Sequence, residues 1–153
     1  MSTRSWIFID NGESQKPRFR GIYCHFDGYL DWVGKNLKEH YDSEDKVRSI
    51  IEQGDASSID ESIEKCKFYH RDNNENLNIR EFDDLRTMMK KYHDSWAEYC
   101  YLFQDGKWKV YFESHRIIPE GGFILLEEAM RREEEAIKED EEKEKKNGDQ
   151  TGE

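Results

Sequence analysis

The chain has 153 residues, with 35 acidic against 24 basic side chains and a net charge of −11. This length supports one domain with a single core and leaves no room for a second domain of similar size. Aromatic residues make up 13% of the chain, which excludes disorder throughout. The acidic balance argues against direct binding to nucleic acid, because contacts with phosphates require clustered Lys and Arg.

The sequence contains no signal for a membrane, for secretion or for a metal site. No apolar run approaches the roughly 20 residues of a membrane-spanning helix, and the N-terminal residues lack the apolar segment of a secretion signal. Cys24, Cys66 and Cys100 are odd in number and widely spaced, which favours a reducing compartment over a disulfide framework. The cysteines and histidines show no metal-ligand spacing such as CxxC. We therefore expect a cytoplasmic protein that contacts no membrane and needs no metal or other cofactor.

The N-terminal residues predict an antiparallel hairpin over residues 5–26. The apolar run Trp6–Ile9 stops at Asp10–Gly12, which is a strong turn signal. A period-2 pattern resumes over Arg18–Phe26, so the second strand follows a loop through Pro17.

Helical spacing follows this hairpin. Apolar residues three or four apart predict a helix over residues 30–41, and Ser43 is a suitable N-cap for a second helix that ends before Gly54. Residues 55–84 are harder to interpret: Ser58 and Glu61 fit a capping box for one helical turn, whereas residues 66–69 fit a short strand. We expect a polar loop over residues 71–78 and a helix over residues 85–92.

The clearest local signal is a second hairpin over residues 96–112. Asp105-Gly106 between alternating apolar residues is typical of a type I′ turn, which needs positive φ at both central positions. The turn places one set of side chains on a core face, in the pairs Phe103–Trp108, Tyr101–Val110 and Tyr99–Phe112. The opposite face is half polar and half apolar, so either a helix or a partner is expected to cover part of it: Glu98, Cys100, Leu102, Lys109 and Tyr111.

The last 27 residues hold 12 of the acidic and 6 of the basic side chains. Six pairs have the acid four residues before the base, the favourable order on a helix: Glu127–Arg131, Glu128–Arg132, Glu134–Lys138, Glu139–Lys143, Glu141–Lys145 and Glu142–Lys146. We predict a charged helix over residues 127–146 that docks through its first turns and then projects into water, followed by a disordered tail over residues 147–153.

These elements predict an α+β domain over residues 1–126. Its sheet is expected to be antiparallel, with about four strands from two hairpins and with helices packed on one face. The densest group of acid/base residue types is His70, Asp72 and Glu75, which leaves a small metal-dependent enzyme as an alternative. Polar loops commonly have this composition, so we predict no catalytic residues and a protein that is not an enzyme.

Five segments occur in an order that resembles a known group. They are Ile22–Tyr29, Val33–Leu37, Gly54–Ser58, Tyr69–Asp72 and Tyr101–Trp108. They resemble small uncharacterised proteins of tailed bacteriophages and prophages with the pattern YCHWDGY…VGKxL…GDxSS, followed by YHRD and YLFxDGKW. The match covers about residues 20–112 and departs at Phe26, where the pattern has Trp, and at Leu30, where Pro is common. This resemblance implies a phage accessory protein in the host cytoplasm.

Composition and resemblance together predict a protein that binds a host protein, within the host's antiviral defence, as an inhibitor or as a sensed trigger. Aromatic anchors with a charged rim are typical of protein interfaces. The predicted anchors lie on the open face of the second hairpin, and the predicted rim lies on the terminal helix: Trp96, Leu102 and Tyr111, with Glu127, Glu128, Glu133, Glu134 and Glu135. The alternatives are an acidic mimic of nucleic acid in a basic groove and self-association through the hairpin faces.

Overall fold

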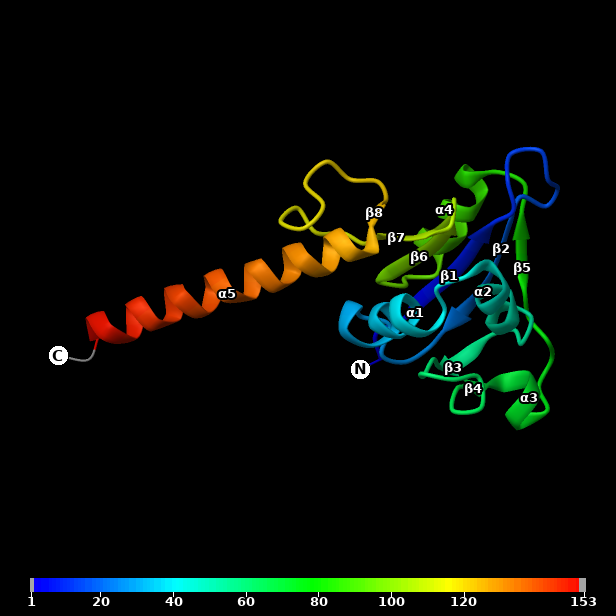
Figure 1. Cartoon of the computed structure of the whole chain (residues 1–153), viewed down its shortest axis with the longest axis horizontal. Coiled ribbons are helices and arrows are strands. Elements are labelled where there is room, and N and C mark those ends of the chain that lie inside the picture. The colour runs from blue at the N-terminus through cyan, green and yellow to red at the C-terminus, as the bar shows by residue number, and fades with distance from the viewer. Residues whose placement is uncertain (1, 152–153) are drawn as a thin grey trace.

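The computed structural model of the protein describes residues 2–151, with side chains described through Asn147. Within these residues, one mixed sheet of eight strands is surrounded by five α-helices and one π-helical turn (Figure 1). The elements in chain order are β1 (Ser5–Asp10), β2 (Phe19–Cys24), η1 (Leu30–Gly34), α1 (Lys35–His40), α2 (Glu44–Ile51), β3 (Ala56–Ser58), β4 (Lys67–Phe68), α3 (Tyr69–Asn73), β5 (Arg80–Phe82), α4 (Leu85–Asp94), β6 (Tyr99–Gln104), β7 (Lys107–Tyr111), β8 (Ile124–Leu125) and α5 (Leu126–Thr151).

The sheet corrects the predicted architecture. The class is α+β, but the strand order is β4-β3-β2-β1-β6-β7-β8, with β5 also paired to β2, so a four-stranded antiparallel sheet is wrong. β1 runs antiparallel to β2 and parallel to β6, with Ser5 opposite Tyr99. β2 also pairs in parallel with β3. The parallel pair β1–β6 joins the two hairpins into one sheet.

Both hairpins themselves are confirmed. β1 pairs with β2, and β6 pairs with β7 in the predicted register, including Phe103 opposite Trp108. Asp105 and Gly106 have φ angles of 53° and 76°, as the type I′ turn requires. The rings of Tyr99 and Phe112 lie with their centroids 4.8 Å apart, so this pair also shares a face.

The larger core lies between the sheet and the helices η1, α1, α2 and the first turns of α5. Its polar aromatic groups have partners: the Tyr101 hydroxyl donates to the Gly28 carbonyl at 2.7 Å, and the Trp108 indole donates to the Tyr41 carbonyl at 2.8 Å. Buried Tyr and Trp side chains usually find such partners, because an unpaired polar group inside a core costs free energy. These bonds fix η1 and α1 against the sheet.

The smaller core lies on the opposite face, where α4 packs on β1 and β6. Met88 and Tyr92 of α4 are buried there together with Trp6, Phe8, Phe19, Cys100 and Leu102. The prediction that helices pack on one face is therefore wrong. The physical reason is visible in the run Tyr99–Phe103: a central strand that is buried on both faces is apolar throughout and does not alternate.

The predicted helices are present with their caps. η1 and α1 together cover the helix expected over residues 30–41, and the Ser43 side chain accepts from the Lys46 amide at 3.4 Å at the start of α2. The Asp84 side chain caps α4 by accepting from the Thr87 amide at 2.8 Å. The region without a clear prediction forms the short strands β3, β4 and β5, and α3 occupies the start of the expected polar loop.

The predicted C-terminal helix is present as α5. Leu126 and Ala129 are buried against the sheet, Ile137 is 49% exposed, and beyond it the helix runs away from the body (Figure 1). Two predicted ion pairs form, from Glu128 to Arg132 at 2.9 Å and from Glu134 to Lys138 at 3.6 Å. α5 continues to Thr151, and the end of the tail predicted over residues 147–153 lies outside the described residues. Among residues 2–151, no helix combines the length and the apolar character needed to cross a membrane.

Asp10 links the two hairpins at the end of β1. Its carboxylate accepts from Arg18 at 2.9 and 3.0 Å, from the Gly12 amide at 2.8 Å and from the Gln104 amide at 2.8 Å. Burial alone would raise the pKa of Asp10, but the hydrogen bonds from Arg18, Gln104 and Gly12 lower that pKa below its ordinary value. The ionised carboxylate therefore stabilises the folded chain.

The core position of Leu102 predicts a large effect of truncation. We expect Leu102→Ala to lower the free energy of unfolding by about 2–5 kcal/mol, because it opens a cavity beneath α4. Leu125→Ala is the matched control, because Leu125 is 42% exposed and its truncation should change stability by only about 0.5 kcal/mol. Urea unfolding of both variants measures the difference, and equal losses would mean that Leu102 is not part of the core.

The Asp10 network predicts a pH dependence. A carboxylate with a lowered folded-state pKa contributes stability above its unfolded pKa of about 3.9, and this contribution is lost as pH falls through the folded pKa. We expect Asp10→Asn to lower the free energy of unfolding by about 1–3 kcal/mol at neutral pH. Urea unfolding at several pH values should show this difference shrinking below pH of about 4. A difference that stays constant with pH would contradict the role of the ionised carboxylate.

Candidate functional site

Four chain segments meet at one end of the sheet. Because β1 and β6 are parallel, their N-terminal ends at Ser5 and Tyr99 lie side by side. β2 runs antiparallel to β1 and ends at Cys24 opposite Ser5, and β7 ends at Tyr111 beside β6. The residues before β1 and β6 and after β2 and β7 are therefore brought together by the topology.

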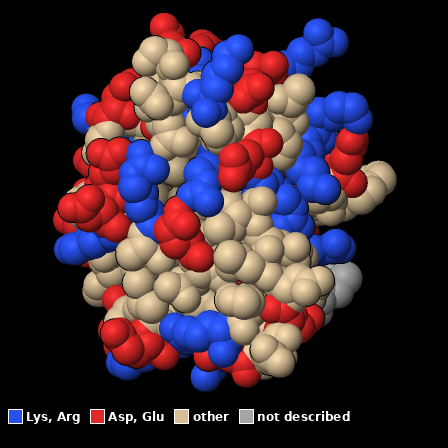
Figure 2. All heavy atoms as spheres, turned by 90° about the vertical axis from the view of Figure 1, so that its right-hand side faces the viewer, with Lys and Arg blue, Asp and Glu red and all other residues tan. Residues whose placement is uncertain are grey.

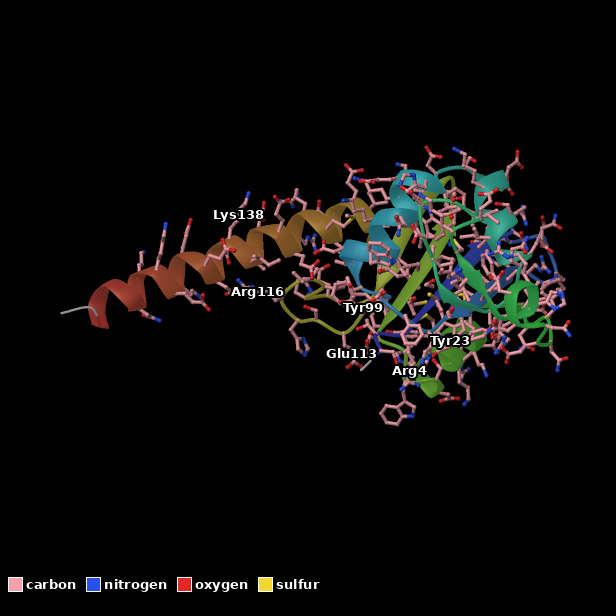
Figure 3. The ribbon with its side chains drawn as sticks, turned by 90° about the horizontal axis from the view of Figure 1, so that it is seen from below. Arg4, Tyr23, Tyr99, Glu113, Arg116 and Lys138 are labelled. Atoms are coloured by element: carbon pink, nitrogen blue, oxygen red, sulfur yellow. The ribbon has the colours of Figure 1, made fainter. Side chains whose placement is uncertain are left out.

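A groove of about 500 Å³ lies at this end of the sheet. Its lining includes the aromatic residues Tyr29, Tyr92, Trp96, Tyr99 and Phe112 and the carboxylates of Glu98 and Glu113. Figure 3 shows Tyr99 and Glu113 at the same end of the body, although Tyr99 begins β6 and Glu113 lies after the end of β7. We name this feature the strand-end groove.

Trp96 is the most exposed large apolar side chain among the described residues, at 83%. Its backbone has a φ of 62°, in the left-handed region that bulky residues rarely adopt. The turn is fixed by its neighbours: the Trp96 amide donates to the His93 carbonyl at 3.3 Å, and the Ser95 hydroxyl accepts from the Trp6 indole at 2.8 Å. A costly backbone conformation thus presents a large aromatic ring to solvent at the groove.

Tyr29 reaches the groove through a tightly packed loop. The Gly28 amide donates to the Thr3 carbonyl at 2.9 Å, and a Cβ atom added at Gly28 would lie 2.8 Å from the Ser5 Cβ. The loop can therefore approach β1 closely only with glycine at this position. Tyr29 itself is 39% exposed, so a rigid loop holds a half-exposed ring at the groove.

Acidic groups surround Tyr99 in the groove. Burial, together with the negative charges of Glu133, Glu98 and Asp31, raises the pKa of Tyr99 to about 12. Burial also raises the pKa of Glu133, with a further contribution from Asp31. Carboxylates from the residue before β6, from η1 and from α5 therefore act on the same aromatic ring.

The structure places the three predicted anchors in different environments. Trp96 lies at the groove, as an anchor requires. Leu102 is 1% exposed beneath α4, so its assignment as a surface anchor is wrong. Tyr111 is half-buried, and its ring packs against Tyr92 and Phe123 with centroids 5.9 and 6.1 Å apart. The hairpin face that was expected to be open is covered by α4. The half-apolar composition of this face indicated a covering helix or a partner, and in the structure a helix covers it.

The residues of the predicted acidic rim also lie at different places in the structure. Glu133 is half-buried and acts on Tyr99 beside the groove. Glu127 and Glu128 line a different hollow beside the β6–β7 turn. Glu134 pairs with Lys138 at 3.6 Å, and Glu135 pairs with Arg131 at 2.6 Å. Of the five rim residues, none lines the strand-end groove, and only Glu133 acts on a residue of the groove, Tyr99.

The residues of the enzyme alternative do not converge. The Asp72 carboxylate accepts from the Phe68 amide at 2.8 Å and pairs with Arg71 at 2.9 Å. The His70 ring nitrogen lies 2.8 Å from the backbone carbonyl of Glu75, so the Glu75 carboxylate is not its partner. Across the described part of the chain, no three His, Cys, Asp or Glu side chains are grouped to hold a metal ion.

The three cysteines are buried thiols. Burial raises the pKa of Cys24 to about 12 and also raises the pKa values of Cys66 and Cys100. A reactive cysteine needs an accessible thiolate, so none of the three has the environment of a nucleophile.

Comparison of the chain with protein-family models, with curated proteins and with solved structures finds no match. The resemblance to phage proteins therefore stays a prediction from the motifs.

Most of the groove could not be found from the sequence. Tyr99 and Phe112 were predicted to lie on the core face of the hairpin, and they do share that face, but their strand ends border the groove. Tyr29 and Glu98 reach it only because β1 pairs in parallel with β6. The one residue of the groove predicted as an anchor was Trp96, which was placed on the open face of the second hairpin, whereas the structure places it in the turn between α4 and β6.

The loop packing predicts the effect of adding one methyl group. We expect Gly28→Ala to lower the free energy of unfolding by about 1–3 kcal/mol and to displace Tyr29, because the new Cβ collides with Ser5. Gly12→Ala is a useful control, because nothing lies within 4 Å of its added Cβ and only the cost of its positive φ remains. Thermal unfolding and the NMR signals of the Tyr29 ring are the measurements. An unshifted Tyr29 ring in Gly28→Ala would contradict this role of the glycine.

Proposed function

We propose that this protein is not an enzyme and that it binds a partner protein through the strand-end groove. The observation that carries the proposal is Trp96, whose ring is 83% exposed on a fixed backbone turn. A large apolar ring in water is unfavourable, and covering it by a partner releases that cost. Trp and Tyr dominate the binding energy at protein interfaces because each removes a large rigid area from water.

The surroundings of Trp96 support a role in recognition. Tyr29 and Tyr99 present further aromatic surface, while Glu98 and Glu113 are polar groups at the same groove. An aromatic centre with charged groups around it is the usual composition of a protein interface. The backbone conformation of Trp96 costs about 1–3 kcal/mol, which a purely structural position would avoid.

The class of partner is proposed from the resemblance to phage proteins. A small phage protein made inside its host meets host proteins at high concentration, so a host protein is the proposed partner. We place the interaction within the antiviral defence of the host, with the protein acting as an inhibitor or as a sensed trigger, in the host cytoplasm.

An acidic mimic of nucleic acid has less support. Such a mimic needs a continuous array of carboxylates, whereas Lys and Arg are interspersed with Asp and Glu across the face turned away from α5 (Figure 2). Many acidic groups of α5 also have basic partners, such as Glu128 with Arg132. Binding by such a mimic would weaken steeply with salt, whereas binding anchored by aromatic rings depends on salt only slightly.

The proposal predicts a partner whose capture depends on Trp96. Tagged wild-type protein, Trp96→Ala and Leu85→Ala are used to capture proteins from a host-cell lysate, and mass spectrometry quantifies what each retains. Leu85 is a matched control, because it is 43% exposed but lies at the other end of α4. We expect one host protein to be captured by the wild type and by Leu85→Ala, and to be reduced by more than about tenfold with Trp96→Ala.

Two outcomes of this capture contradict the proposal. One is a host protein that all three forms retain equally, because its contact then lies elsewhere. The other is the absence of any protein specific to the wild type. Self-association through Trp96 is a third case. Sedimentation identifies it, because the wild type would then have a higher mass in solution than Trp96→Ala.

A further inference from the structure

We propose that the strand-end groove takes a cationic side chain, from Arg or Lys, in a flexible segment of the partner protein. This inference rests on the proposed function and names the chemistry that the groove recognises. Three observations carry it: the exposed aromatic faces, the carboxylates without basic partners and the engagement of nearby basic side chains elsewhere.

The aromatic rings provide surfaces for a cation. A guanidinium or ammonium group within about 6 Å of the face of Trp or Tyr is attracted by the negative potential of the ring. Trp96 and Tyr29 are 83% and 39% exposed, so their rings are accessible from solvent, and Tyr99 is half-buried between them and the core. Trp is the ring with the strongest attraction of this kind, and it is the most exposed of these side chains.

The carboxylates of the groove lack basic partners. Some carboxylates of the folded body have a basic partner, as Asp10 has in Arg18 at 2.9 Å and Asp55 has in Arg80 at 3.0 Å. Within residues 2–147, neither Glu98 nor Glu113 forms an ion pair, and no Lys or Arg lines the groove.

Two further carboxylates increase the negative potential. Asp31 and Glu133 act on Tyr99 from the side of η1 and α5, and within the described residues neither of them forms an ion pair. Glu98 and Glu113 therefore lie beside the aromatic rings of the groove without a Lys or Arg partner, which is the arrangement that a bound cation completes, while Asp31 and Glu133 act on Tyr99 from outside the groove lining.

Arg4 and Arg116 have partners outside the groove. The Arg4 carbonyl accepts from the Glu98 amide at 2.9 Å, so Arg4 adjoins the groove, but its side chain interacts with the Tyr23 hydroxyl, and both residues lie to one side of Tyr99 in Figure 3. Arg116 binds α5, with bonds of 3.0 Å to Asp140 and 3.1 Å to Glu139, and Figure 3 shows it beside that helix. Neither residue lines the groove, which leaves a place there for a cation of the partner.

Other ligand classes fit the groove less well. A phosphate or a carboxylate would be repelled by Glu98 and Glu113. A purely apolar segment would bury these two carboxylates without a compensating charge, which is costly. A cationic side chain uses the aromatic faces and the carboxylates together.

The test uses three short peptides and the full-length protein. Each peptide is acetylated and amidated, with glycines around a central Arg, Gln or Glu. The readout is the NMR signal of the Trp96 indole N–H, which is assigned among the four Trp residues by its loss in Trp96→Phe. We expect the Arg peptide to shift this signal in a saturable manner, while the Gln and Glu peptides leave it in place over the same concentration range.

Charge variants test the role of the carboxylates. We expect Glu98→Gln and Glu113→Gln each to weaken binding of the Arg peptide by roughly two- to fivefold. Glu120→Gln is the control with the same change of net charge, because Glu120 is exposed in the loop before β8 and does not line this groove. The NMR spectrum of each variant reports whether it is folded. Glu98→Gln and Glu113→Gln are tested singly, so the test does not depend on whether the double variant folds.

The outcomes separate this inference from the proposed function. The cationic assignment is overturned if the Gln peptide binds as well as the Arg peptide, if the Arg peptide leaves Trp96 unshifted, or if neither glutamate variant weakens binding. A host protein whose capture needs Trp96 but neither Glu98 nor Glu113 would leave the proposed function standing and overturn only the cationic assignment. Capture that is indifferent to Trp96 would overturn the proposed function, whatever the peptides do.

Discussion

The parallel pairing of β1 with β6 determines where the core and the candidate site of this protein lie. It aligns Ser5 with Tyr99 and so joins two hairpins into one sheet whose central strands are buried on both faces. The same pairing places the starts of both strands at one end of the sheet, beside the ends of β2 and β7. A change of this register would disrupt the packing of α4 and the strand-end groove together, because both use residues of the same strands.

Local chemistry accounts for the parts of the fold that could be predicted from the sequence. The Asp105-Gly106 turn and the Ser43 cap act within a few residues, so their patterns are visible without the tertiary structure. The parallel pair joins distant segments, and nothing near Ser5 indicates that its neighbour is Tyr99. Because this pairing was not predicted, Leu102 was assigned to the surface, although it lies in the core. The half-polar face that includes Lys109 left open whether a helix or a partner covers it, and the anchor assignment chose the partner; in the structure the Lys109 ammonium group binds the Gln104 side chain at 2.6 Å.

The candidate site, like the fold, could be predicted from the sequence only in part. Trp96 was predicted as an anchor because it is a large aromatic residue at the start of the predicted hairpin. Glu98 and Tyr29 could not be identified from the sequence, because neither residue is unusual in its own segment, and they come together only in the groove that several segments form. The acidic residues of α5 formed a clear pattern in the sequence, but that pattern described a helix stabilised by its own ion pairs, and none of these residues lines the groove.

In the proposed function, the acidic helix and the aromatic groove make two different contributions to recognition. Residues 127–153 hold 12 acidic and 6 basic side chains, so this part of the chain carries a net negative charge. Such a charge acts over about a Debye length and raises the rate at which a cationic partner arrives. The exposed rings of Trp96 and Tyr29 act only at short range, so in the proposed complex they set how slowly the partner leaves. Glu133 links the two contributions, because it belongs to the helix and its charge acts on Tyr99 of the groove.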